Sequence, residues 1–256
     1  MIKKKKQRKI DFILGGAQKS GTSALAYYLR QHPDVGMGEV KELHYFNNEA
    51  VFSKKYIDYS KYENRFDFNQ DKLIYGEATP IYLYWVPAAE RIWNYNSDIK
   101  LIFILRNPIH RAFSHWNMEF DRPKESNETK DFSYAIRNER LRVREKLPLQ
   151  HMYYSYLDRG YYSEQIRRYK RFFKDEQLMF IKYENFKNNQ NSVLNQIFSF
   201  LNVNEENFNF KERVINEHKK HSNLNLQDKE YLLNLYEFEI KQVEKILDWD
   251  CSDWLE

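Results

Sequence analysis

The sequence predicts an α/β fold, in which a single domain has a central parallel sheet flanked by helices. Short apolar runs at 10–14, 100–105 and 178–183 have the length and continuity of buried parallel strands. Segments with helical character lie between and after these runs, and strands that alternate with helices are typical of a parallel sheet. A chain of 256 residues is long enough to form one large domain of this kind.

The first strand, 10–14, leads through a glycine-containing loop into a helix that ends before His32-Pro33. A short strand is expected at 72–75, with a turn at 76–80 after it. The helix after the 100–105 strand begins at Asn107-Pro108, because proline is favoured at the first helical position. The other expected helices share amphipathic or apolar character and lie at 86–94, 132–144, 163–173, 192–201 and 227–247.

Charge and composition narrow the possible partners and location. Lys and Arg number 41 against 37 Asp and Glu, and the net charge of +4 argues against a dedicated nucleic-acid binder. No run approaches the length of a membrane span and no signal-type segment opens the chain, so we expect a cytoplasmic protein without integral membrane association. The single Cys251 fits a reducing compartment. Residues 1–9, MIKKKKQRK, are predicted to be a basic disordered leader before a domain at 10–256.

The loop after the first strand has the features of an anion-binding site. It carries Lys19, Ser20 and Gly21, and Thr22 and Ser23 open the next helix. Backbone N–H groups and the helix N-terminus favour negative charge at such a place. A Walker-type nucleotide loop has its lysine after the second glycine, whereas Lys19 precedes Gly21. The loop is therefore P-loop-like in its grip on an anion, and the usual magnesium ligand is in doubt.

The end of the 100–105 strand indicates a second anion site. Phosphoryl transferases usually have a magnesium-binding aspartate at the end of a neighbouring strand, but here Arg106 follows the strand. An arginine is suited to bidentate phosphate binding and unsuited to binding a metal. Ser114 lies eight residues further on, in the next helix. Together these residues predict a nucleotide with phosphates at both ends of its ribose and no requirement for a metal.

Several motifs resemble one enzyme family. KSGTS follows one strand, LRNPIHRAFSHW overlaps and follows another, and GYYSEQIRRYKRFF and the ending LDWDCSDWLE complete the pattern. They resemble the sulfotransferases that use 3′-phosphoadenosine 5′-phosphosulfate (PAPS), closest to the heparan-sulfate and related glycan branch and its bacterial relatives. The resemblance extends from Asp11 to Leu255. It implies the sulfotransferase fold, PAPS as donor and adenosine 3′,5′-bisphosphate as product.

The resemblance also implies roles for the anion-binding residues. Residues 19–23 correspond to the binder of the 5′-phosphosulfate, and Arg106 with Ser114 to the binder of the 3′-phosphate. HKKHSN, 218–223, resembles the late loop that covers the cofactor, which makes Lys219 and Lys220 candidate cofactor contacts. This segment departs from the lysine-glycine-arginine pattern of the vertebrate enzymes.

The acceptor side is assigned by the same resemblance. KELHYF, 41–46, is similar to a family segment whose glutamate is the catalytic base, so Glu42 is the predicted base. Lys19 is the predicted catalytic cation, which stabilises charge on the departing bridging oxygen. His44 is the competing base, because other sulfotransferase branches use histidine. Lys41 and His44 are also expected to contact the acceptor.

GEATP, 76–80, resembles the family turn that lines the acceptor cleft, and this implies acceptor contacts for Glu77 and Thr79. The family favours a carbohydrate hydroxyl as acceptor. Two alternatives stay open. A nucleotide-dependent phosphotransferase would need ATP and magnesium, and a non-catalytic nucleotide- or glycan-binding module would share the fold without the activity.

Overall fold

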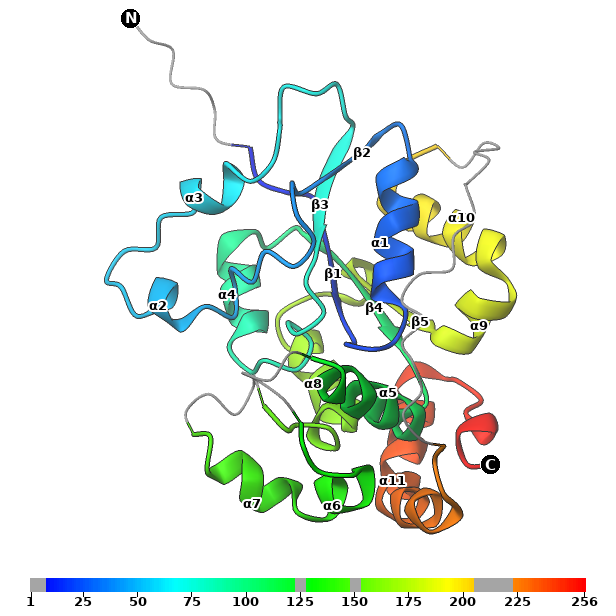
Figure 1. The fold of residues 1–256 in the computed structure, drawn as a ribbon. Helices are drawn as coiled ribbons and strands as arrows, with labels where there is room; N and C mark the ends of the chain where they lie inside the picture. Colours follow the sequence, from blue (N-terminus) through cyan, green and yellow to red (C-terminus); the bar gives the residue numbers. More distant parts are fainter. Residues whose placement is uncertain (1–7, 123–127, 148–152, 205–222) are drawn as a thin grey trace, which may run out of the picture. The chain divides into compact units, whose positions relative to one another are not determined.

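The computed structural model describes residues 8–122, 128–147, 153–204 and 223–256 (Figure 1). These residues form two compact units. The first comprises 8–17, 21–105 and 168–204, and the second comprises 18–20, 106–122, 128–147, 153–167 and 223–256. The chain therefore passes from the first unit to the second and back within the loop that follows the first strand.

The first unit contains a five-stranded sheet in the order β2-β3-β1-β4-β5, and every neighbouring pair is parallel. The strands are β1 Phe12–Gly16, β2 Val35–Met37, β3 Ile74–Ala78, β4 Lys100–Leu105 and β5 Leu178–Lys182. The predicted α/β fold with a central parallel sheet flanked by helices is confirmed.

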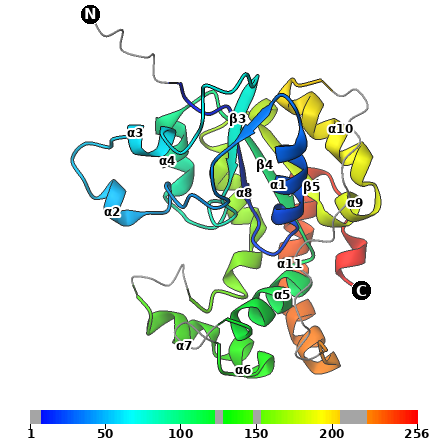
Figure 2. The same ribbon diagram turned by 45° about the horizontal axis from the view of Figure 1, so that its top comes forward.

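The first unit also contains several helices. They are α1 Thr22–Gln31, α2 Glu49–Phe52, α3 Ser60–Glu63, α4 Ala88–Tyr95, α9 Tyr183–Asn188 and α10 Gln190–Leu201, with a short 3₁₀ turn, η4 Asp175–Gln177. Both views show α1, α9 and α10 side by side (Figures 1 and 2). α1 contacts β1, β2 and β3, and α9 and α10 contact β5.

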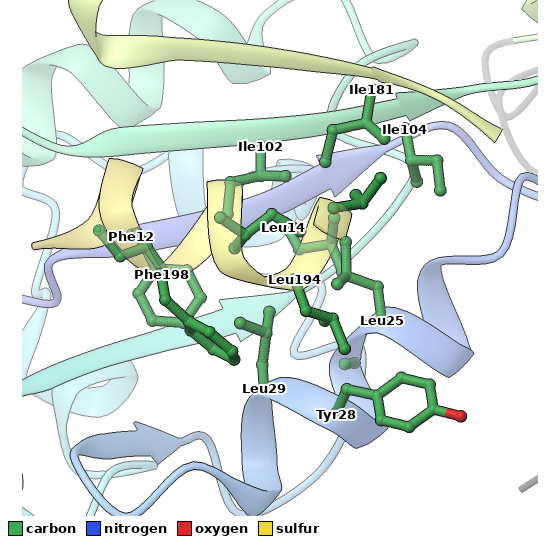
Figure 3. Close-up of a cluster of buried hydrophobic side chains, with 14 of the residues drawn as sticks. Phe12, Leu14, Leu25, Tyr28, Leu29, Ile102, Ile104, Ile181, Leu194 and Phe198 are labelled. Atoms are coloured by element: carbon green, nitrogen blue, oxygen red, sulfur yellow. The ribbon is translucent and has the colours of Figure 1, made fainter. Parts of the chain in front are cut away.

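The core of the first unit lies between the sheet and these helices (Figure 3). Strand residues pack there against residues of α1 and α10, and these side chains are at most 5% exposed: Phe12, Leu14, Ile102, Ile104, Ile181, Leu25, Leu29, Leu194 and Phe198. Burying one such side chain contributes about 1.5–3 kcal/mol. Phe103 contacts a different partner, since its ring lies 4.6 Å from that of Tyr169. β4 is therefore buried on both faces, as its continuous apolar sequence predicts.

The second unit is helical. Its elements are α5 Pro108–Phe120, α6 Phe132–Arg137, α7 Glu139–Arg144, η3 Asp158–Gly160, most of α8 Tyr162–Lys170, α11 Leu226–Leu247 and η5 Ser252–Trp254. The Asn107 side chain caps α5 by accepting the N–H of Ile109 at 2.9 Å, and Pro108 is the first helical residue, as predicted. No helix in the described part of the chain combines the length and apolar character that crossing a membrane requires.

Three local expectations differ from the structure. β2 was not predicted. Gly76 to Ala78 belong to β3 rather than to a turn, because a glycine there lets β1 approach: a Cβ on Gly76 would lie 2.4 Å from the Phe12 ring. The expected helix at 132–144 is divided at Asn138, whose backbone N–H and side-chain amide both donate to the Tyr134 carbonyl, at 3.1 and 3.0 Å, and so close α6.

Candidate active site

The N-terminus of α1 is shaped to receive an anion. Gly21 is the N-cap residue with φ of 91°, so it offers no side chain to cap the helix, and the first turn has no acidic residue. The helix dipole favours negative charge at this end. A Cβ on Gly21 would lie 3.0 Å from the Tyr183 ring, so the residue is constrained by both conformation and space. Thr22 is buried and Ser23 is half-buried at this end.

In the second unit, Arg106 lies next to residues 18–20, which belong to the loop between β1 and α1. Its guanidinium donates to the carbonyl of Lys19 at 3.2 Å. Ser20 is fully buried, and Ser114 is half-buried in the second turn of α5. Two of the residues predicted to bind opposite ends of a nucleotide, Lys19 and Arg106, are therefore brought together.

Sequence reasoning missed Arg159 and Gln18 beside Lys19. The Arg159 guanidinium donates to the Gln18 side chain and, at 2.8 Å, to the Ser155 hydroxyl, and Arg159 is 4% exposed. Arg159 lies in η3, about 140 positions after Gln18, so no local motif links it to the loop.

His115, in α5, is affected by the same arginine. Burial, and then the charges of Arg159 and Arg111, hold the pKa of His115 well below its usual value, so this histidine stays neutral.

The 41–46 segment of the first unit brings three predicted residues together. The Lys41 ammonium donates to one carboxylate oxygen of Glu42, and His44 Nε2 lies 3.4 Å from the other. Burial alone would raise the pKa of Glu42, but the His44 hydrogen bond and the Lys41 charge outweigh it and lower the pKa to about 2. The hydrogen bond to Glu42 raises the pKa of His44. The two oxygens of the Glu42 carboxylate thus face an ammonium and an imidazole.

Glu77 and Thr79 lie inside the first unit, with exposures of 1% and 0%. The Glu77 carboxylate accepts hydrogen bonds from Thr79 at 2.5 Å and from Tyr62 at 2.6 Å. Burial raises the pKa of Glu77, and the hydrogen bonds oppose this effect. The polar side-chain atoms of Glu77 and Thr79 therefore make hydrogen bonds inside the first unit.

The other predicted residues do not belong to these groups. Lys219 and Lys220 lie outside the described residues, as do residues 1–7 of the leader. Within the described ranges, no cluster of three or more His, Cys, Asp or Glu side chains has a metal-binding arrangement.

Comparison with known proteins identifies the class. The family model named "Sulfotransferase domain" matches residues 9–247, so the chain belongs to the sulfotransferase domain family. A crystal structure of a sulfotransferase from Alicyclobacillus acidocaldarius is similar, with a TM-score of 0.81 and 26% identity over 97% of this chain and 100% of that one.

Two curated relatives are also similar to the chain. The membrane-associated sulfotransferase kil1 of Dictyostelium discoideum is 24% identical over 94% of this chain and 65% of its own length. Heparan sulfate glucosamine 3-O-sulfotransferase 5 of Mus musculus is 28% identical over 75% of this chain and 53% of its own length. The chain thus spans 65% and 53% of the lengths of these two relatives.

Proposed function

We propose that this protein transfers a sulfuryl group from PAPS to an acceptor hydroxyl on a carbohydrate. The observation that carries the proposal is the contact between Arg106 and Lys19. It brings an arginine, where phosphoryl transferases have a metal-binding aspartate, to the loop with the displaced lysine. Membership of the sulfotransferase domain family supports the same reading.

PAPS would supply the activated sulfuryl group. The uncapped N-terminus of α1, with Thr22 and Ser23, has the donors that a 5′-phosphosulfate needs. Arg106 and Ser114 are assigned to the 3′-phosphate. Lys219 and Lys220 are assigned to covering the nucleotide. In this proposal the site works without a metal, in the cytoplasm, with no nucleic-acid partner and no integral membrane association.

Glu42 is the proposed base. It takes the proton of the acceptor hydroxyl as the oxygen bonds to sulfur and the bond between sulfur and the bridging oxygen of the nucleotide breaks. Lys19 stabilises the charge that develops on that bridging oxygen. A carboxylate with a pKa of about 2 is a weak base, because Lys41 and His44 hold its charge. An anionic group on the acceptor would pair with Lys41 and His44 and so release Glu42 to act.

An anionic glycan suits this requirement, since it carries both hydroxyls and negative charges. The name of the mouse relative refers to heparan sulfate glucosamine, which supports a carbohydrate acceptor here. We therefore assign a sulfated or carboxylated glycan as the acceptor class, with Lys41 and His44 as its first contacts.

Radiolabelled PAPS offered with heparan sulfate and a panel of glycans tests the proposal. We expect transfer by the unaltered protein and a loss on the order of 10²–10⁴-fold in kcat for Glu42→Gln, because the base is removed. Lys19→Ala is expected to be similarly impaired. Glu39→Gln is the matched control, because Glu39 is an exposed glutamate of the same region, paired with Arg65 at 2.6 Å. Near-normal rates in both Glu42→Gln and Lys19→Ala would remove the mechanism, and transfer of phosphate from ATP with magnesium would favour a phosphotransferase.

A further inference from the structure

A buried hydrogen-bond network joins β3 to the 41–46 segment within the first unit. Its centre is the Glu77 carboxylate, which accepts hydrogen bonds from the hydroxyls of Tyr62 and Thr79 and, at 3.1 Å, from that of Tyr82. These residues are all at most 1% exposed. Polar atoms buried this far from water must be satisfied within the protein. The Glu77 carboxylate is satisfied by these three hydroxyls and by the backbone N–H of Leu43, which belongs to the 41–46 segment.

The Tyr82 hydroxyl links this network to the backbone of the 41–46 segment. It accepts the N–H groups of Tyr45 at 2.9 Å and Phe46 at 3.3 Å. A phenol hydroxyl has one proton to donate and two lone pairs to accept with. Because Glu77 takes the proton, the lone pairs of the Tyr82 oxygen are left to accept, and the two backbone N–H groups are among their donors. Glu77 therefore sets the orientation in which Tyr82 can hold the segment.

Tyr82 is itself held firmly. Its carbonyl accepts a hydrogen bond from the Tyr169 hydroxyl at 2.8 Å. The next residue, Leu83, donates its N–H to the Gly15 carbonyl of β1 at 2.8 Å, and Thr79 donates to Leu14 at 3.1 Å. The hydroxyl is thus fixed relative to the sheet, and a segment bound to it is fixed as well.

The segment needs such support. It has no helix or strand of its own, and Glu42 and His44 have φ of 64° and 52°, in the left-handed region that non-glycine residues avoid. Residues stay in this region only when their surroundings hold them there. One end is held by the Glu42 N–H, which donates to the Ala78 carbonyl at 2.9 Å. The Tyr82 hydroxyl holds the other end.

We propose that Tyr82, oriented by Glu77, is a positioning residue that keeps the Glu42 carboxylate in place to accept the proton of the acceptor hydroxyl. This inference rests on the proposed function, in which Glu42 is the base. Tyr82 touches no reacting atom and acts through the backbone at Tyr45 and Phe46. Small displacements of a catalytic group cost rate steeply, which makes the effect measurable.

The variant Tyr82→Phe removes the hydroxyl and keeps the ring. Tyr95→Phe is its matched control, because Tyr95 is 1% exposed and its hydroxyl also accepts a backbone N–H, that of Ile10, at 3.0 Å. Both changes delete one buried phenol oxygen, but only the first affects the 41–46 segment. Glu77→Gln is a second variant that leaves the Tyr82 side chain intact and weakens the acceptor to which Tyr82, Tyr62, Thr79 and the Leu43 backbone N–H donate.

A double-mutant cycle with PAPS and an accepted glycan separates positioning from general damage. We expect Tyr82→Phe to lower kcat on the order of 10²-fold, with the KM for PAPS unchanged, and Glu77→Gln to lower it less. In the Glu42→Gln background the same Tyr82→Phe change is expected to cost less than about 3-fold, because there is no base left to position. Tyr95→Phe should match the unaltered protein. An equal loss from Tyr82→Phe in both backgrounds, or no loss, would overturn the proposal.

Amide hydrogen exchange, followed by NMR, tests the same inference without activity. The amides of Tyr45 and Phe46 should exchange at least about tenfold faster in Tyr82→Phe than in Tyr95→Phe, because their acceptor is lost. Unchanged exchange of these two amides would show that Tyr82 does not hold the 41–46 segment, whatever the catalytic rates of the variants. If the unaltered protein transfers no sulfuryl group, or Glu42→Gln is fully active, the proposed function fails, and the exchange result still decides whether Tyr82 holds the segment.

Discussion

The 17–21 loop, to which the proposal assigns the donor, and the 41–46 segment, to which it assigns the base, are built differently. The loop joins a buried strand to a helix, and its key feature, a left-handed glycine at the N-terminus of α1, is local. The 41–46 segment belongs to no regular element and has two left-handed residues that are not glycine. Its shape depends on the Ala78 carbonyl and the Tyr82 hydroxyl, more than 30 positions away.

The difference indicates two ways to hold a functional group. A strand–loop–helix presents backbone N–H groups through its own local geometry. In the proposed function these groups bind the anionic donor, which enters in every catalytic cycle. A strained segment held by distant hydrogen bonds presents a single side chain instead. Such strain persists only while those bonds do, so the two regions should respond differently to substitution.

The largest effect is expected on the loop side, from Gly21→Val. A β-branched residue is disfavoured at a φ of 91°, and its Cβ would press on the Tyr183 ring. We expect a loss of about 1–3 kcal/mol in the free energy of unfolding in urea. Calorimetry should show at least about 10²-fold weaker binding of adenosine 3′,5′-bisphosphate, because about 3 kcal/mol of lost interaction corresponds to that factor.

The control for this change is Gly38→Ala. Its added Cβ would lie 3.3 Å from the ends of the Leu43 and Phe66 side chains, and Gly38 has no positive φ. We expect stability within about 1 kcal/mol of the unaltered protein. If Gly21→Val bound the nucleotide normally, the anion would not lie at the start of α1.

A smaller effect is expected on the acceptor side, from His44→Gln. His44 and Lys41 lower the pKa of Glu42 to about 2 against the opposing effect of burial, so removing His44 should raise it toward the ordinary 4.5. The stability that Glu42 contributes is present above pH 4.5 and is lost as the pH falls toward its folded pKa. His44 has a raised pKa, so its contribution is present below 6.5 and is lost as the pH rises through the folded value.

A pH titration of the Glu42 carboxyl by carbon NMR measures this shift directly. The midpoint should lie near 2 in the unaltered protein and clearly higher in His44→Gln. Asn47→Ala is the control, because Asn47 contacts only the far nitrogen of His44, at 3.2 Å, and the Glu42 midpoint should stay low. Equal midpoints in His44→Gln and the unaltered protein would mean that His44 does not hold the carboxylate.

The contrast between a locally built loop and a segment held by distant residues also explains which features the sequence could predict. β4 and α5 follow from an unbroken apolar run and from the Asn107-Pro108 start, and the structure has them at the expected residues. The anion loop is equally local, and the contact of Arg106 with Lys19 follows once both are placed after strands.

Tyr82, Arg159 and the interior placement of Glu77 were not predicted. Tyr82 and Arg159 act through partners distant in sequence, and the burial of a glutamate depends on three hydroxyl donors that no spacing rule brings together. Glycine is common in turns, so the sequence predicts a turn at Gly76, whereas in the structure Gly76 lies in β3 and makes room for the Phe12 ring of the neighbouring strand β1. Tertiary contacts, rather than local propensity, decided each of these positions.

The central claim is that Arg106 helps to bind the 3′-phosphate of a nucleotide whose 5′ end lies at the Lys19 loop. Calorimetry of adenosine 3′,5′-bisphosphate against adenosine 5′-phosphate, with the unaltered protein and Arg106→Gln, tests it directly. The account predicts that the unaltered protein prefers the bisphosphate by at least about tenfold and that Arg106→Gln loses this preference, since one charge-assisted phosphate contact is worth about 1.5–3 kcal/mol. Equal affinity of the unaltered protein for both nucleotides would contradict it.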